Sequence, residues 1–135
     1  MPRLSVLALS ARLPDWAEAA CAEYAKRMPK GYELARIAVK QEQRLRAALP
    51  RNARLIALDE RGKDYNTRQF AGLLKTEAAF VIGGADGLPA DLKSEASLLL
   101  RLSSLTLPHA LAQVVLLEQL YRAATLLTGH PYHRE

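Results

Sequence analysis

The sequence predicts a single α/β domain, residues 1–135, built around a mostly parallel β-sheet. Short apolar segments typical of β-strands alternate along the chain with segments whose apolar residues repeat at helical spacing. Half of the residues are apolar, which is enough for an ordinary buried core, and 135 residues leave little room for a second domain.

Five segments are predicted to be β-strands because each is short, largely apolar and bounded by polar or turn-forming residues. The segment Glu33–Val39 differs from the others because it alternates apolar and polar residues, so one of its faces should be wetter. The predicted strands are residues 4–9, 33–39, 54–58, 78–82 and 98–102.

The first helix is expected to begin at Pro14-Asp15, where Asp15 and Glu18 have the spacing of a capping box. Apolar residues four apart form a stripe along one face of this helix, which predicts contact with the core or with another subunit. The stripe consists of Trp16, Ala20, Tyr24 and Met28.

A charged helix is predicted over residues 40–49, after the second strand. Such a run is usually a solvated helix face, and contact with RNA is the alternative interpretation. The basic residues in and beside it are Lys40, Arg44, Arg46 and Arg51.

Three more helices should follow the third strand, which is expected to end in a turn at residues 59–62. Thr67 is the predicted N-cap of the first of them, and Pro89 can open the second. Pro108 introduces the third and longest, and Gly129 ends it. These helices are predicted at residues 67–74, from residue 89, and at residues 109–127.

The composition bounds the partners and the compartment. Nineteen Lys and Arg against fourteen Asp and Glu give a net charge of +5, which favours an anionic partner such as RNA, although many soluble proteins are basic for no such reason. Cys21 is the only cysteine, so no internal disulfide can form, and it is expected to be a small buried residue. No group of residues has metal-ligand spacing, so no metal is predicted.

No membrane segment is expected. The longest uncharged stretch, residues 102–117, is interrupted by Pro108 and is shorter than a membrane span. Residues 1–11 resemble a signal peptide superficially, but an opening β-strand explains them better because charged residues follow at once. We therefore expect a soluble, cytoplasmic protein.

Three segments could carry chemistry. Gly83, Gly84 and Gly87 leave a predicted strand at its carboxyl end, where ligands bind in open α/β sheets, although a plain tight turn explains them equally well. The uncharged, hydroxyl-rich loop at residues 102–109 could hold a flat heterocycle through main-chain hydrogen bonds, or be an ordinary connection capped by Thr106. Two histidines, a tyrosine and an arginine crowd residues 130–135, although short tails of this kind also arise by chance.

These segments, taken with others along nearly the whole chain, resemble the RlmH family, the bacterial large-subunit rRNA pseudouridine N3-methyltransferases of the SPOUT superfamily. The run from SLTLPH to the closing HPYHRE is the most specific part of the resemblance. The matching segments are LPDW (13–16), EYAKRMPK (23–30), LIALDERGK (55–63), VIGGADGL (81–88), LSSLTLPHALAQVVLLEQLYRA (102–123) and HPYHRE (130–135).

The resemblance implies a SPOUT-type fold with a trefoil knot in the C-terminal half, a homodimer, and S-adenosylmethionine held by the knotted loops. Base rates alone argue against a knot, so this expectation rests on the resemblance. By position, the implied cofactor-binding residues are Leu58, Gly84, Leu102, Ser103, Ser104, Leu105, Thr106 and Leu107.

The implied reaction is methyl transfer to N3 of a pseudouridine in large-subunit (23S) rRNA, with the assembled ribosome as the expected substrate. The N3–H proton must be removed and the resulting charge stabilised. Arg134 is expected to offset phosphate or base charge, and a histidine to accept or relay the proton. The implied substrate-side residues are His109, Tyr132, His133 and Arg134, with the tail reaching the partner subunit's pocket.

The chain departs from the family between Val39 and Arg54, where family members usually carry a longer basic stretch, and at GGADG, where GGPEG is frequent. The shorter segment bears on how rRNA docks, and the basic residues at 40–51 could retain that role. Two other functions stay open: a non-catalytic RNA- or ribosome-binding module of the same fold, and a methyltransferase acting on another RNA such as tRNA.

Overall fold

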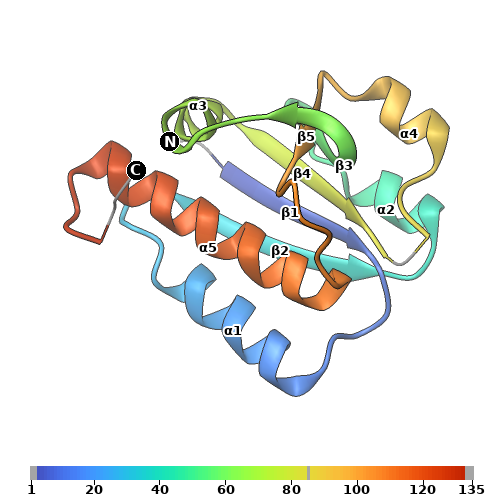
Figure 1. The fold of residues 1–135 in the computed structure, drawn as a ribbon, viewed down its shortest axis with the longest axis horizontal. Helices are drawn as coiled ribbons and strands as arrows, with labels where there is room; N and C mark the ends of the chain where they lie inside the picture. Colours follow the sequence, from blue (N-terminus) through green and yellow to red (C-terminus); the bar gives the residue numbers. More distant parts are fainter. Residues whose placement is uncertain (1–2, 85, 133–135) are drawn as a thin grey trace.

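Strands and helices alternate in the computed structural model, which describes residues 3–84 and 86–132 (Figure 1). The strands are β1 (Arg3–Leu9), β2 (Glu33–Val39), β3 (Arg54–Asp64), β4 (Ala78–Gly83) and β5 (Leu98–Arg101). The helices are α1 (Asp15–Lys26), α2 (Glu42–Ala48), α3 (Thr67–Gly72), α4 (Ala90–Glu95) and α5 (His109–Thr128), with a 3₁₀ turn, η1 (Leu73–Lys75), after α3. Each strand and helix predicted from the sequence is present, so the α/β prediction is confirmed.

The five strands form one sheet in the order β2-β1-β4-β3-β5. Every pairing between these strands is parallel, which confirms the predicted mostly parallel sheet. β1 and β4 lie inside the sheet, and Leu7, Phe80 and Val81 on them are fully buried. Strands covered on both faces need such apolar runs, which is why the sequence pattern identified them.

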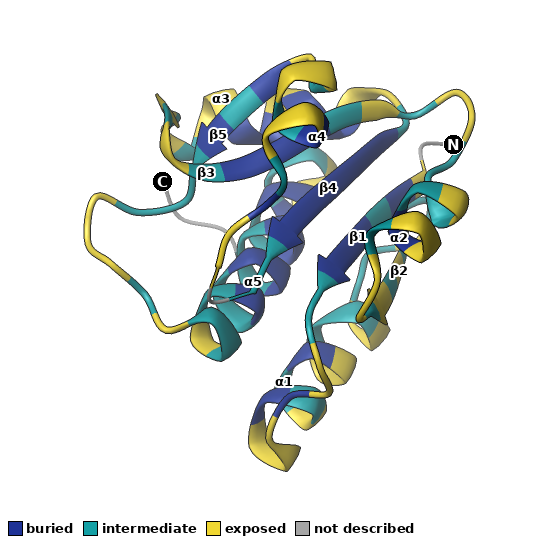
Figure 2. Cartoon of the chain, turned by 90° about the vertical axis from the view of Figure 1, so that its right-hand side faces the viewer, coloured by how far each residue is buried: buried dark blue, intermediate teal, exposed yellow. Residues whose placement is uncertain are grey.

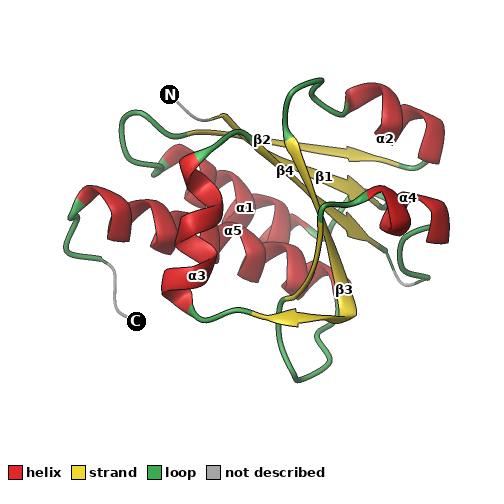
Figure 3. Cartoon of the chain, turned by 90° about the horizontal axis from the view of Figure 1, so that it is seen from above, coloured by secondary structure: helices red, strands yellow, loops and turns green. Residues whose placement is uncertain are grey.

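Helices cover both faces of the sheet (Figure 3). α1, α3 and α5 pack on one face, where Cys21, Phe70 and Leu120 join the larger core cluster. α2 and α4 pack on the other face through Leu45 and Leu92. None of the helices in the described ranges has the length and apolar character needed to cross a membrane.

The third strand is longer than predicted: residues 59–62 interrupt its pairing with β5, where the turn was expected, but they do not end the strand. β3 continues to Asp64 beside β5, with a register shift between Leu58 and Lys63. Gly62 lies so close to β5 that a Cβ there would come within 2.6 Å of the Leu100 backbone. A glycine therefore permits this close approach of two strands, and the pairing with β5 overrides the turn-like composition.

Two helix starts differ from the predictions. The N-cap of α3 is Asn66 rather than Thr67: its side chain accepts a hydrogen bond from the Gln69 N–H, and the Gln69 side chain accepts one from the Asn66 N–H, each at 2.9 Å. The N-cap of α1 is Pro14, so Asp15 caps nothing, while the Glu18 carboxylate accepts from the Leu13 N–H at 3.1 Å. Gly129 ends α5 as predicted.

The predicted apolar stripe of α1 only partly faces the core. Tyr24 and Met28 pack against it, but the residues buried most deeply on this helix are Ala17 and Cys21. Trp16 is 57% exposed. Of the two predicted roles for the stripe, contact with the core therefore does not apply to Trp16, and contact with another subunit stays a prediction for it.

Candidate functional site

A cleft of about 800 Å³ opens at the carboxyl ends of the strands. Its walls are the middle of β3, the end of β4 with the glycine turn that follows, the connection from β5 to α5, and the first turn of α5. Figure 2 looks toward this side of the sheet and shows the exposed connection running from β5 to α5. Ligands of α/β proteins bind at this end of parallel strands.

The residues predicted to bind the cofactor all line this one cleft. Leu58 lies on β3, Gly84 follows β4, and the loop from Leu102 to Leu107 follows β5. They are 18 or more residues apart along the chain, yet the parallel sheet brings the three strand ends to the same edge. The loop residues that line the cleft are Leu102, Ser103, Ser104, Leu105, Thr106 and Leu107.

The glycine segment forms a tight turn at the cleft wall. The Gly87 N–H donates to the Gly84 carbonyl at 3.0 Å, and Gly87 has a φ of 76°, which favours glycine. The turn leaves main-chain groups rather than side chains facing the cleft at Gly83 and Gly84. The tight-turn interpretation of this segment is confirmed, and the binding loop stays a prediction for residues that line the cleft.

In the loop after β5, the Ser103 hydroxyl accepts a hydrogen bond from the Leu105 N–H at 2.9 Å. The Leu105 side chain is 76% exposed, the most exposed of the large apolar residues. An apolar side chain held out beside a cleft offers a contact surface for a ligand or a second chain.

Charged residues of both signs also line the cleft, and the sequence analysis did not predict them as site residues. Asp59 faces Lys93 across the cleft wall at 3.4 Å, with the Asp59 side chain 17% exposed. The Asp59 carboxylate also accepts from the Arg61 N–H at 3.2 Å. Arg101 pairs with Asp64 and holds the pKa of that carboxyl below its usual range. The position of Asp59 directly after Leu58 was the available signal.

His109 is the first residue of α5 and lines the cleft. Its Nε2 atom is buried and has no hydrogen-bond partner within the described part of the chain. Buried polar atoms are normally paired, so an unpaired one in a cleft wall points to a ligand or a partner group that supplies the missing contact.

Tyr132 lies at the far end of α5, away from the cleft of its own chain. Its hydroxyl donates to the Glu118 carboxylate at 2.7 Å, and its ring centroid is 4.5 Å from that of Tyr121. Burial, and then the Glu118 carboxylate, raise the pKa of Tyr132. Glu118 lies about 14 Å along the helix axis from His109, and Tyr132 does not line the cleft of its own chain. His133 and Arg134 lie outside the described residues.

The predicted basic helix divides into two kinds of residue. Arg46 forms ion pairs with Glu42, Asp91 and Glu95 at 2.7–3.1 Å and ties α2 to α4, and its pKa is raised mainly by the hydrogen bond to Glu42. Arg46 is thus a structural residue. Lys40, Arg44 and Arg51 are exposed, which fits the predicted solvated face and leaves them accessible for the alternative, an RNA contact.

Within residues 3–84 and 86–132, no group of three or more His, Cys, Asp or Glu side chains is arranged to hold a metal ion. Cys21 is buried, as predicted, and burial raises the pKa of its thiol.

Close relatives of this chain cover almost its whole length. Ribosomal RNA large subunit methyltransferase H of Paraburkholderia phymatum is 49% identical over 154 aligned residues, which cover 98% of this chain and 99% of the relative. The protein of the same name from Laribacter hongkongensis is 44% identical over 155 residues, with the same coverage. Because these alignments are longer than the 135 residues of this chain, the relatives carry insertions that it lacks.

Solved structures share the fold at low sequence identity. A probable methylase family protein from Haemophilus influenzae superposes with a TM-score of 0.61 and 14% identity over 98% of this chain and 70% of that chain. The SpoU methyltransferase AviRb from Streptomyces viridochromogenes, solved with AdoMet, gives 0.57 and 14% over 97% of this chain and 58% of that one. The family model for predicted SPOUT methyltransferases matches residues 3–133. This protein belongs to the SPOUT methyltransferase family.

Proposed function

We propose that this protein is an S-adenosylmethionine-dependent methyltransferase that methylates N3 of a pseudouridine in bacterial large-subunit (23S) rRNA, with the assembled ribosome as substrate. The observation that carries the proposal is that the three cofactor segments implied by the family line one cleft. The full-length similarity to methyltransferases named for large-subunit ribosomal RNA supports the choice of substrate. The protein would then act in the cytoplasm, where ribosomes are.

The cleft fits the cofactor in size and chemistry. Its volume of about 800 Å³ lies in the range of small-molecule sites. The main chain at Gly84 and along Leu102–Leu107 would hold the adenosine part through backbone hydrogen bonds. Asp59 and Lys93, which carry opposite charges, suit a cofactor whose methionine part carries both an ammonium and a carboxylate.

The chain has to orient the base, take up its proton and balance the charge that develops on it. The bound cofactor supplies an electrophilic methyl group on a sulfonium sulfur. His109 can accept or relay the N3 proton, since its Nε2 is unpaired in the cleft wall. Arg134, at the end of the chain, would offset the charge on the base or a phosphate.

A homodimer would complete the site. Tyr132 is held against Glu118 and does not line the cleft of its own chain, so we propose that the tail completes the cleft of a second copy. The exposed Trp16 on α1 and Leu111 on α5 provide apolar surface for such an interface. We also propose that the C-terminal half forms the trefoil knot that the family resemblance implies. The loop from β5 to α5 would be one of the segments that form this knot.

Methyl transfer tests the proposal. Purified protein and labelled S-adenosylmethionine are incubated with ribosomes that lack the modification, and the labelled nucleoside is identified by mass spectrometry. Methylated pseudouridine in 23S rRNA is the expected product. Label found in tRNA instead would mean that the substrate is tRNA and not 23S rRNA. Cofactor binding without methyl transfer to any RNA would favour a non-catalytic RNA-binding module over an enzyme.

A further inference from the structure

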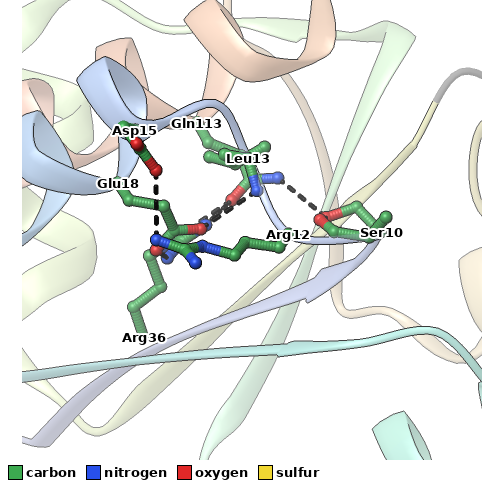
Figure 4. A network of polar contacts seen from close by, with 8 residues as sticks. Ser10, Arg12, Leu13, Asp15, Glu18, Arg36 and Gln113 are labelled. Atoms are coloured by element: carbon green, nitrogen blue, oxygen red, sulfur yellow. Dashed lines mark hydrogen bonds and ion pairs between the residues drawn. The ribbon is translucent and has the colours of Figure 1, made fainter.

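We infer that Gln113 is a positioning residue for the cleft: through Arg36 and Ser10 it fixes the start of α5 against the carboxyl end of β1 (Figure 4). The inference rests on the proposed function, because the cleft that it concerns is the proposed cofactor site. Gln113 lies outside the lining of that cleft.

Gln113 is a polar residue in an otherwise apolar part of α5. Its side chain has no exposed surface, and Leu116, Leu117 and Leu120 on the same helix are equally buried. A leucine would fit this pattern without the cost of burying an amide. The amide must therefore be held by strong partners, and its presence indicates a role that an apolar residue would not perform.

Those partners come from distant parts of the chain. The Gln113 carbonyl oxygen accepts from Arg36 Nη2 at 2.8 Å and from Arg36 Nε at 3.1 Å. The Gln113 Nε2 group donates to the Ser10 hydroxyl at 3.2 Å, and that hydroxyl donates to the Ala11 carbonyl at 3.0 Å. The two ends of one amide thus join strand β2 and the residue that follows β1.

Arg36 is itself held rigidly. Its side chain is 13% exposed, and Nη1 donates to Glu18 at 3.0 Å. Glu18 in turn accepts from the Leu13 N–H, which ties the start of α1 to the same group. A guanidinium is planar, so fixing one edge on Glu18 fixes the direction of the edge that meets Gln113. The charges of Arg36 and Glu18 cancel, and the network can stay buried.

Both ends of the network reach the walls of the cleft. Gln113 is four residues after His109 and therefore lies on the same face of α5, one turn further along. At the other end of the network, Ser10 and the preceding Leu9 lie against Gly84 in the opposite wall. A Cβ at Gly84 would lie 3.1 Å from the Leu9 carbonyl oxygen. Gln113 therefore sets the spacing between the His109 wall and the Gly84 wall.

Removing the amide should change cofactor binding rather than only stability. Gln113→Leu leaves the Arg36 donors and Ser10 without their partner, so α5 can shift relative to β1. We expect the dissociation constant for S-adenosylmethionine, measured by calorimetry on the full chain, to rise about tenfold, because a shift of α5 displaces one wall of the cleft. Gln113→Glu keeps the acceptor for Arg36 and should restore affinity to within about threefold of the wild type.

Thr125→Val is the matched control. Thr125 is as fully buried on α5 as Gln113, but its hydroxyl donates to the Arg122 carbonyl in the same helix at 2.7 Å, and Thr125 does not line the cleft. It should lower the melting temperature and leave cofactor affinity unchanged. If Gln113→Leu does not fold, Ser10→Ala tests the same connection from its other end, with a smaller loss of affinity expected.

Cofactor affinity that stays at the wild-type value in Gln113→Leu, or in Ser10→Ala where the first variant does not fold, would overturn the inference. So would a loss of affinity in Thr125→Val that matches its loss of stability. Failure of the wild-type protein to bind S-adenosylmethionine would be a different result, since it would contradict the proposed function itself.

Discussion

The hydroxyl of Tyr132, four residues beyond the end of α5, donates a 2.7 Å hydrogen bond to Glu118, fourteen residues earlier in the middle of that helix. Glu118 also accepts from Arg122 at 2.8 Å, and the Arg122 guanidinium lies 5.1 Å from the centre of the Tyr132 ring. Tyr132 is thus fixed against α5 of the same chain, and its hydroxyl proton is donated to the Glu118 carboxylate. This geometry suits a residue that anchors the tail better than one that exchanges a proton.

Tyr132→Phe tests the anchoring role. It removes the hydroxyl but keeps the ring against Tyr121, so we expect a loss of about 1 kcal/mol in the free energy of unfolding, the usual contribution of one hydrogen bond. Cofactor affinity should stay unchanged, because Tyr132 is remote from the cleft of its own chain. The kcat on ribosomes should fall moderately. Urea unfolding, calorimetry and methyl transfer measure the three quantities, and complete loss of turnover would instead assign Tyr132 a direct part in the reaction.

Asp59→Asn should weaken binding of the cofactor more than binding of its demethylated product. The substitution removes the negative charge that balances Lys93 at 3.4 Å in the cleft wall. S-adenosylmethionine carries a positive sulfonium that the product lacks. We expect the dissociation constant for the cofactor to rise about tenfold, and that for S-adenosylhomocysteine to change less.

Asp91→Asn is the control for this comparison. Asp91, on α4, pairs with Arg46 on α2 and does not line the cleft, so neither dissociation constant should change. Equal effects of Asp59→Asn on cofactor and product would mean that Asp59 acts on the amino-acid end that both molecules carry, and not on the sulfonium.

Glu18 should make stability depend on pH. The hydrogen bond from Arg36, followed by that from the Leu13 N–H, lowers the pKa of Glu18 below its ordinary value of 4.5. A carboxyl whose pKa is lower in the folded state stabilises the fold above the unfolded value, and this contribution is lost as the pH falls through the folded pKa. The difference in unfolding free energy between wild type and Glu18→Gln should be constant from pH 7 to pH 5 and shrink below about pH 4.5.

The same measurement on Glu23→Gln provides the reference for Glu18. Glu23 lies on the same helix and forms an exposed ion pair with Arg27. Exposed pairs contribute little to stability, so this variant should stay close to wild type at each pH. A difference for Glu18→Gln that does not shrink in acid would mean that its effect comes from packing rather than from the charge.

Sequence reasoning succeeded where the signal is local. β4 was identifiable because AAFVI is an apolar run with a glycine turn after it, and the long helix because Pro108 and Gly129 bracket it. The cleft followed from the rule that ligands lie at the carboxyl ends of parallel strands, together with the family segments. The extension of β3 was missed because residues 59–64 are charged and turn-like, and only pairing with β5 makes them a strand.

Long-range polar contacts had no such signal. Arg36 and Gln113 are 77 residues apart, and although Gln113 is polar among apolar neighbours, nothing in the sequence names Arg36 as its partner. Lys93 meets Asp59 across 34 residues for the same reason. The cap of α3 was misplaced by one residue because Asn66 and Thr67 are both good N-caps, and the choice was made by the reciprocal bond with Gln69.

The two arginines of α2 should separate folding from RNA docking. Arg46 is engaged by three carboxylates on α2 and α4, so Arg46→Met should lower the melting temperature. Arg44 is exposed and has no ion-pair partner in the described residues, so Arg44→Met should leave stability unchanged. If α2 contacts the rRNA backbone, Arg44→Met weakens ribosome binding and reduces the slope of log affinity against log salt by about 1. An unchanged slope in Arg44→Met would exclude Arg44 from the contact, because each phosphate contact formed on binding releases about one counterion, and losing such a contact must reduce the slope.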